Sequence, residues 1–237
     1  MSARTPVPHE RHAAPPDDEP AGAKPARTND PEQTKRDIIA VATGEFASKG
    51  LAGARIDEIA AKTRTSKRMI YYYFGSKEGL YVAVLEEAYR SIRHVELDLE
   101  ADHRLDHLPP ERALAELTRF TFDSHVENPA FVRLVCNENL HYGRFVQQSA
   151  RIQALNLPAI NTILRIVERG RHDGTFRSDV DPVDLHMTIS ALCFYNVSNQ
   201  YTFSVIFKAD MASPGALAAR RESVVRTVVA SVKPRTA

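Results

Sequence analysis

Residues 62–74 combine two kinds of side chain that can bind phosphate groups. The segment carries four cations and no acid, and it ends in three tyrosines and a phenylalanine. Cations attract polyanions, and a phenol packed on a helix surface can donate its hydroxyl to a phosphate oxygen. The pattern therefore predicts a local contact with a polyanion. The side chains concerned are Lys62, Arg64, Lys67, Arg68, Tyr71, Tyr72, Tyr73 and Phe74.

Two short helices joined by a tight turn must position these side chains. Residues 55–63 have the apolar spacing of a helix that packs on a core. Residues 64–66 form the turn, and Ser66 is placed to cap a second helix from residue 67 to about residue 73. This arrangement is a helix-turn-helix, in which the second helix lies in the DNA major groove with its N-terminal residues at the base edges.

The three tyrosines cannot all face one core, because successive helical residues are rotated by about 100°. Ile70 and Phe74 are spaced as a core pair, with Tyr73 beside them. Tyr71 and Tyr72 then lie on the outer face with the cations. We interpret the cations as attracting the DNA backbone and the rings as fixing the position of the helix upon it.

The basic character is local. The 237-residue chain has 31 Lys and Arg against 30 Asp and Glu, which gives a formal net charge of +1. Residues 31–80, in contrast, hold nine cations and six acids, so this segment has a surplus of three. With 43% hydrophobic residues, the chain is able to bury the core of one or two domains.

The remaining sequence predicts an all-α fold of about nine helices. Apolar residues recur at helical spacing, and no stretch alternates with period two. Four helix starts pair a capping side chain with proline, and Ser76 is a further cap. We expect a disordered tail over residues 1–30, a DNA-binding domain over 31–78 and a larger helical domain over 79–233. The four pairs are Asp30-Pro31, Asn128-Pro129, Asp181-Pro182 and Ser213-Pro214.

The stretch "RIDEIAAKTRTSKRMIYYYFGSKEGLYVAVL", preceded by "IIAVATGEFASKGLAGA", resembles the TetR family of bacterial transcriptional regulators over about residues 35–85. Later stretches, "FVRLVCNENLHYGRF" and "DVDPVDLHMTISALCFYNVSNQYTFS", look more loosely like the C-terminal domain of one branch of that family. The resemblance implies groove contacts from one set of residues and phosphate contacts from another. The first set is Thr65, Lys67, Arg68 and Met69, and the second is Arg55, Tyr71, Tyr72 and Lys77. Arg64 and Ser66, in the turn between the helices, are also predicted to be DNA-binding residues.

Two positions depart from the family pattern. Family members usually have Thr where this chain has Ala54, and Gly where it has Arg64. A positive φ at Arg64 costs a non-glycine residue about a kcal/mol or more. Either the turn geometry differs here or a phosphate contact from Arg64 offsets the strain.

The resemblance also implies a homodimer, a palindromic DNA operator and a small-molecule effector that releases a repressor from it. Apolar surface in residues 160–167 and 187–207 is more than one monomer core needs, as in helix-pair dimer interfaces. Polar groups embedded in apolar helices mark a candidate pocket for a neutral or weakly polar ligand, although such groups also satisfy helix ends and interfaces. The pocket candidates are Phe120, Asn137, Asn139, His141, Tyr142, Asn196, Asn199 and Gln200.

Two other classes of function are open. An all-α enzyme has little support, because GxSxG, Walker A, GxGxxG and HExxH motifs are absent. His103 and His107 have i, i+4 spacing but no third ligand, so we expect neither a metal site nor a cofactor. The other class is a DNA-binding regulator without small-molecule control.

The cysteines and the longest uncharged segment indicate the compartment in which we expect the protein and whether it contacts a membrane. Cys136 and Cys193 form no CxxC pair, which favours two buried thiols in a reducing, cytoplasmic compartment. Residues 185–207 lack Asp, Glu, Lys and Arg, but they contain Asn196 and Gln200, which a lipid bilayer tolerates badly. We therefore expect a helix buried in protein and no contact with a membrane.

Overall fold

The computed structural model describes residues 30–103 and 105–234, with the side chains of all of these except 95–103 and 156–159. The described residues form ten α-helices, two short 3-10 helices and no strand. The all-α prediction is confirmed, with one α-helix more than the nine or so expected. The tail predicted to be disordered lies outside the described residues, apart from Asp30.

The helices follow one another along the chain with short connections. The first four are α1 (Pro31–Gly53), α2 (Ile56–Thr63), α3 (Lys67–Phe74) and α4 (Lys77–His103). After the 3-10 helix η1 (Leu105–His107) come α5 (Pro110–Glu127), α6 (Pro129–Leu140), the 3-10 helix η2 (Val146–Gln148) and α7 (Ala150–His172). The last three are α8 (Pro182–Ser198), α9 (Gln200–Phe207) and α10 (Pro214–Val232).

Three of the four predicted Pro-containing helix starts are capped as expected. The side chains of Asp30, Asp181 and Ser213 each accept a hydrogen bond from a backbone N–H of the first turn. Asn128 does not, because it is the only residue between α5 and α6 and its side-chain amide donates to the carbonyl of Ser124 instead (2.9 Å). A helix therefore begins at each predicted proline, but the start of α6 lacks the side-chain cap found at the other three.

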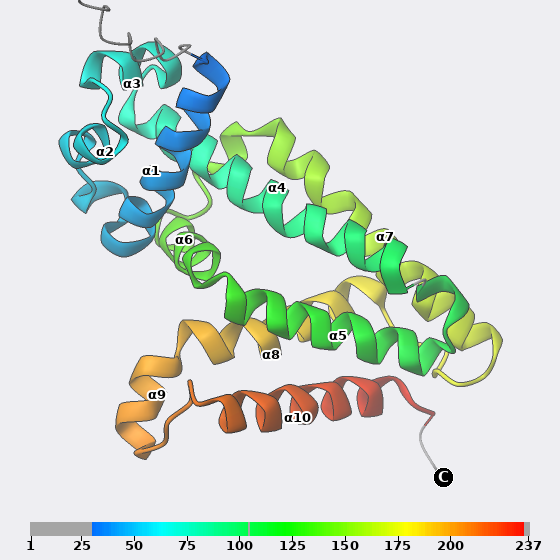
Figure 1. Ribbon diagram of the computed structural model, residues 1–237. Coiled ribbons are helices and arrows are strands. Elements are labelled where there is room, and N and C mark those ends of the chain that lie inside the picture. The colour runs from blue at the N-terminus through cyan, green and yellow to red at the C-terminus, as the bar shows by residue number, and fades with distance from the viewer. Residues whose placement is uncertain (1–29, 104, 235–237) are drawn as a thin grey trace, which may run out of the picture.

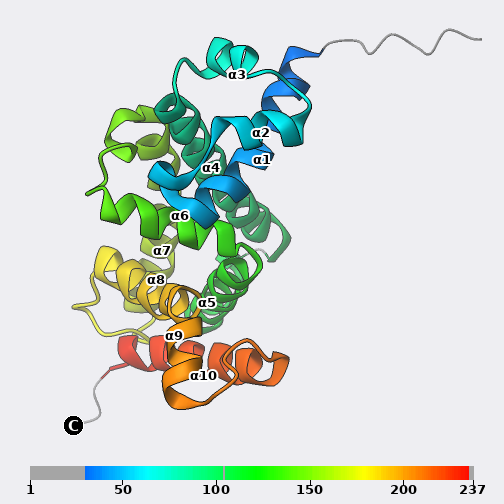
Figure 2. The same cartoon turned by 90° about the vertical axis from the view of Figure 1, so that its left-hand side faces the viewer.

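Two clusters of buried side chains hold the fold together. The N-terminal cluster joins α1, α2, α3 and the first half of α4. It also includes Leu134 of α6, Ile152 of α7 and, between these two helices, Phe145. The C-terminal cluster joins α5, α7, α8 and α10. Figures 1 and 2 place α3 at one end of the molecule and α10 at the other, with α4 and α7 running side by side between them.

Tyr81 of α4 lies at the centre of the N-terminal cluster and is fully buried. Its ring makes edge contacts with Phe46 of α1 (5.1 Å between centroids) and with Phe145, which follows α6 (5.3 Å). Burial, reinforced by the carboxylate of Glu138, raises the pKa of the Tyr81 phenol. Because α4 continues without a break past residue 78, the two predicted domains share this helix, and their division at residue 78 stays a prediction.

In the C-terminal half, α5 packs against α10 and α8. Two ion pairs cross from α5 to α10: Arg119 with Glu222 (3.1 Å) and Arg221 with Asp123 (3.0 Å). Cys193 is buried in this cluster, whereas Cys136 of α6 is half-buried, so the expectation of two buried thiols holds for one of them.

The expectation of a single buried helix over residues 185–207 is wrong. The segment forms two helices, and α8 ends at Ser198, before Asn199. No residue of α9 is buried, and Val205, Ile206 and Phe207 are each more than 60% exposed. None of the helices in the described part of the chain has the length and apolarity needed to cross a membrane.

A buried carboxylate stabilises the contact between α1 and α2. Glu45 is 3% exposed, and its two oxygens lie 2.7 Å from the ammonium of Lys49 and 3.3 Å from that of Lys62. The hydrogen bond from Lys49 is the main cause that lowers the pKa of Glu45 from 4.5 to about 2. A carboxyl group with a lowered pKa in the folded state stabilises that state when it is ionised.

We expect Glu45→Gln to lower the free energy of unfolding by about 2–3 kcal/mol at neutral pH, measured by urea denaturation. The matched control is Glu58→Gln, which removes an exposed partner of Lys49 and is expected to change stability by less than about 0.5 kcal/mol. Since the pKa is lowered, the stabilisation is complete above the ordinary pKa of 4.5 and is lost as the pH falls towards 2. A difference between wild type and Glu45→Gln that did not shrink over this range would contradict the assignment.

Candidate nucleic-acid interface

Helix α3 is anchored by one fully buried side chain and by a cap at its start. Ile70 is 0% exposed and packs in the N-terminal cluster, as predicted. The Ser66 hydroxyl accepts a hydrogen bond from the N–H of Met69 (3.2 Å), so the predicted N-cap is confirmed. Phe74 and Tyr73 are half-buried against the same cluster. These contacts fix the helix while they leave four of its eight residues exposed.

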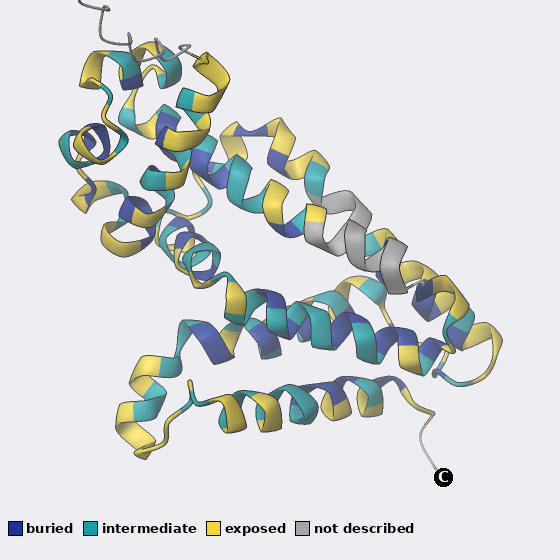
Figure 3. Cartoon of the chain, in the orientation of Figure 1, coloured by how far each residue is buried: buried dark blue, intermediate teal, exposed yellow. Residues whose placement is uncertain are grey.

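The open face of α3 carries the charged and phenolic side chains. Tyr72 is 78% exposed and Tyr71 is 44% exposed, and Lys67 and Arg68 are exposed beside them, while Met69 is half-buried. Figure 3 shows this end of the molecule with exposed residues on its outer surface. The predicted separation of Ile70 from the outward-facing tyrosines is therefore confirmed.

An acid of α2 compensates part of this charge. Asp57 forms an ion pair with Lys67, the first residue of α3, and lies 3.9 Å from the guanidinium of Arg55. A phosphate that binds Lys67 must therefore compete with Asp57. Asp57 was not predicted from the sequence, because an acid in the first turn of a helix is also explained by the helix dipole.

The turn between α2 and α3 adopts the strained geometry considered above. Arg64 has φ 52° and ψ 34°, in the left-handed region. The N–H of Thr65 donates to the carbonyl of Ala60 (3.1 Å) and that of Arg64 to the carbonyl of Ala61 (3.3 Å), which is the Schellman pattern. The turn thus keeps the geometry that glycine favours, although arginine occupies it, with its side chain exposed.

The other predicted contact residues surround α3. Arg55 precedes α2 and is exposed, Thr65 is half-buried in the turn, and Lys77 begins α4. The Lys77 ammonium donates to the carbonyl of Ala52 at the end of α1 (3.3 Å), so it ties two helices together in this structure. Ala54 is 2% exposed and supplies no hydroxyl at the start of α2.

The eight predicted pocket residues do not line one cavity. Asn196, Asn199 and Gln200 lie together in a cavity of about 180 Å³ between α8, α9 and α10. Asn137 lines a different cavity of about 190 Å³ between α1, α6 and the α8–α9 junction, and Gln200 borders both. The other four lie apart from these cavities. Phe120 packs on the C-terminal cluster, and His141 contacts the ring of Phe145. Asn139 is exposed and donates to the carbonyl of Val135, and Tyr142 is 92% exposed.

The sequence analysis also missed several residues of the cavity between α8, α9 and α10. Its wall includes Tyr195, Phe203, Met211 and Arg220. A cation on an amphipathic helix is ordinarily assigned to the solvent face, so nothing in the local pattern indicated that Arg220 borders a cavity.

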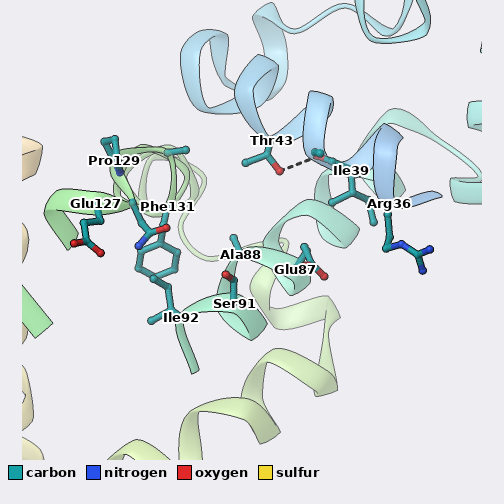
Figure 4. A pocket seen from close by; sticks show the side chains of 13 residues that line it. Arg36, Ile39, Thr43, Glu87, Ala88, Ser91, Ile92, Glu127, Pro129 and Phe131 are labelled. Carbon is teal, nitrogen blue, oxygen red and sulfur yellow. Dashed lines mark hydrogen bonds between the residues drawn. The ribbon is translucent and has the colours of Figure 1, made fainter. Parts of the chain in front are cut away.

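A larger cavity of about 500 Å³ lies where the DNA-binding helices meet the body of the protein. Figure 4 shows side chains from α1, α4 and the α5–α6 corner converging on it. Its apolar lining includes Ile39, Ala88, Ile92 and Phe131. The ring of Phe131 also makes an edge contact with Tyr89 of α4 (5.3 Å), so α6 contacts α4 directly beside this cavity.

The described residues contain no group of three or more His, Cys, Asp or Glu side chains placed to hold a metal ion. His107 lies exposed in η1, and the side chain of His103 is outside the described part of the structure.

A solvent-facing recognition helix on a three-helix domain, followed by a larger helical body, defines a helix-turn-helix DNA-binding regulator. Residues 38–84 match the family model described as bacterial regulatory proteins, tetR family, and residues 110–228 match that described as tetracyclin repressor-like, C-terminal domain. The chain belongs to the TetR family of transcriptional regulators, which are DNA-binding proteins and not enzymes.

Individual relatives agree with this assignment. The chain is 37% identical over 192 residues to the HTH-type transcriptional repressor NicS of Pseudomonas putida, over 81% of this chain and 89% of that protein. Among solved structures, the Streptomyces coelicolor protein SCO4942 has a TM-score of 0.62 and 29% identity, over 85% of this chain and 99% of that one. A TetR-family protein from Rhodococcus RHA1 shares the fold at a TM-score of 0.67 and 19% identity, over 86% of this chain and 99% of that one.

The strained turn allows stability and DNA binding to be separated. We expect Arg64→Gly to raise the free energy of unfolding by about 0.5–1 kcal/mol, because glycine adopts positive φ without the Cβ clash. DNA affinity is expected to fall about threefold to tenfold, and the dependence of log affinity on log salt to lose about one unit of slope. Urea denaturation and DNA-binding titrations at several salt concentrations measure the two effects.

Lys208 provides the matched control. It ends α9 with φ 52° and ψ 41°, in the same left-handed conformation as Arg64, far along the chain from α3. Lys208→Gly is expected to stabilise the protein to a similar extent and to leave DNA affinity unchanged. Equal DNA affinity for Arg64→Gly and wild type would show that Arg64 makes no phosphate contact.

Proposed function

We propose that the protein is a homodimeric repressor that binds a palindromic operator and is released from it by a small molecule. The observation that carries the DNA-binding part is the open face of α3, where Lys67, Arg68, Tyr71 and Tyr72 are exposed around a single buried anchor. The repressor named among the relatives supports the direction of regulation.

The contacts with DNA follow from the positions of the side chains on α3. Lys67 and Arg68 stand at its N-terminal end, where residues reach base edges, and either cation can pair with guanine O6 and N7. The hydroxyl groups of Tyr71 and Tyr72 reach the phosphate backbone at the side of the helix. Lys67 exchanges its pairing with Asp57 for a pairing with DNA.

The dimer interface is proposed on the exposed apolar face of α8. Val183, Met187, Ala191 and Tyr195 are spaced four residues apart and are all exposed, three of them by more than half. An apolar stripe of this kind is typical of a face that is covered in an assembly. Residues 160–167, the other segment predicted for this role, are mainly core, because Ile163, Ile166 and Val167 are buried and Leu164 is only 37% exposed.

Release by a small molecule is supported by the cavity where α1, α4 and the α5–α6 corner meet. Helix α4 belongs to the N-terminal cluster at one end and packs along α7 in the body. A ligand that prefers one arrangement of these helices over another shifts the spacing of the two α3 helices in a dimer, by no more than its difference in affinity for the two arrangements. A regulator without small-molecule control remains the second candidate.

Selection of bound sequences from random duplex DNA tests the DNA-binding proposal. We expect a palindromic consensus whose half-sites lie about one helical turn, or roughly 34–36 Å, apart. A consensus without symmetry, or no enrichment at all, would contradict the proposal of a dimer that reads two half-sites. Release from the selected DNA by a compound that also raises the melting temperature would distinguish the two candidates.

Charge placed on the α8 stripe tests the dimer. We expect Met187→Glu to be monomeric at micromolar concentration by light scattering, because two carboxylates would be buried across a twofold axis. Its affinity for the full operator is expected to fall at least a hundredfold, while the circular dichroism spectrum stays helical. Leu140→Glu, at a somewhat more exposed apolar position at the end of α6, is the control and should remain dimeric. A wild-type protein that is monomeric when bound to a half-site would refute the proposal.

A further inference from the structure

The cavity between α8, α9 and α10 has two polar groups without partners on its wall. Asn196 of α8 is 4% exposed, and neither its side-chain oxygen nor its nitrogen has a hydrogen-bond partner among the described residues. An unpaired buried amide is unfavourable, and native proteins rarely retain one without a reason. Asn196 borders the 180 Å³ cavity, so a ligand there is within reach of its amide.

The second group is the guanidinium of Arg220 on α10. Its neighbour Arg221 pairs with Asp123 and Glu222, and Glu222 also pairs with Arg119. None of the ion pairs in the described part of the chain includes Arg220, although it is half-buried. Arg220 therefore contributes to the cavity wall a positive charge that no ion pair among the described residues neutralises.

The remaining wall combines apolar and aromatic side chains with two further amides. Tyr195, Phe203 and Met211 line the cavity together with Asn199 and Gln200. A dry apolar cavity of about 150 Å³ is large enough to hold benzene, so 180 Å³ suits one aromatic ring with a small substituent. The lining residues therefore combine apolar and aromatic surface with the donor groups of Arg220 and Asn196.

We propose that this cavity binds a small aromatic carboxylate. The carboxylate accepts two parallel hydrogen bonds from the Arg220 guanidinium, a geometry in which arginine and carboxylate fit each other. The Asn196 amide donates to the same group, and the ring lies against Phe203 and Met211. The residues of this cavity are separate from those of the 500 Å³ cavity at the DNA-binding helices. An anionic ligand also replaces the neutral or weakly polar one expected from sequence.

The position of the cavity connects ligand binding with both proposed interfaces. Tyr195 belongs to the exposed stripe of α8 as well as to the cavity wall. Gln200 also borders the neighbouring cavity, where Asn137 donates to the carbonyl of Phe46 in α1 (3.2 Å). Binding of the carboxylate does not require DNA. Only the effect of the carboxylate on operator binding rests on the proposed function.

Calorimetric titration of the full chain with benzoate, in the absence of DNA, tests the site. We expect saturable one-to-one binding of benzoate, at least tenfold weaker binding of the neutral isostere benzamide, and no competition by inorganic phosphate or acetate at equal concentration. Competition by phosphate would show a general anion site and overturn the aromatic part of the proposal. Absence of benzoate binding at millimolar concentration would overturn the proposal as a whole.

Two variants and a control locate the binding. Arg220→Gln is expected to lower benzoate affinity at least tenfold, whereas Arg226→Gln, on the exposed side of the same helix, should not change it. Asn196→Leu should also weaken benzoate binding while raising the melting temperature of the ligand-free protein, because it removes an unpartnered amide. Undiminished affinity in Arg220→Gln would place the ligand elsewhere. Since operator binding is measured separately, a dimeric DNA-binding protein that ignores benzoate overturns this site and leaves the proposed function intact.

Discussion

The central constraint on this molecule is that an eight-residue helix must be rigid while four of its residues stay exposed. An isolated helix of this length does not persist in water. Helix α3 is therefore held from one side by Ile70, from its start by Ser66 and from its end by the turn at Gly75, which has φ 74°. Helices α1, α2 and α4 form the cluster into which Ile70 inserts, so the packing of these three helices holds α3 in place.

The cluster that anchors α3 also connects it with the body of the protein. Tyr81 of α4 is enclosed between Phe46 and Phe145, so the cluster that anchors α3 contains residues from both halves of the chain. Well-packed side chains transmit displacements because interiors have little free volume to absorb them. Under the proposed function, a shift of α6 against α4 on ligand binding would therefore reach α3 through this cluster.

The sequence predicted those features that depend on short segments. The cap at Ser66, the burial of Ile70 and the starts of α1, α8 and α10 follow from chemistry within four residues, which does not need the rest of the fold. The turn at Arg64 shows the limit of this reasoning. Resemblance indicated the position of the strain, but only the structure showed that the chain accepts a left-handed arginine there.

Features that depend on which helices meet were less predictable. The break at Asn199 has no glycine or proline to mark it, and α9 remains apolar yet exposed. The predicted pocket residues are distributed over two cavities and the surface, because a polar residue in an apolar helix has the same local pattern whether it faces a cavity, a helix end or solvent.

Arg220 and Arg221 illustrate why such assignments need the tertiary structure. They are adjacent on α10 and equally charged, yet Arg221 reaches the carboxylate of Asp123 on α5 while Arg220 borders a cavity. The 100° rotation between neighbouring helical residues is enough to give one a partner and leave the other without one. The α5 partner of Arg221 is Asp123, which lies 98 residues earlier in the chain. The two arginines therefore differ in what they contact, and this difference makes Arg220 available to a ligand.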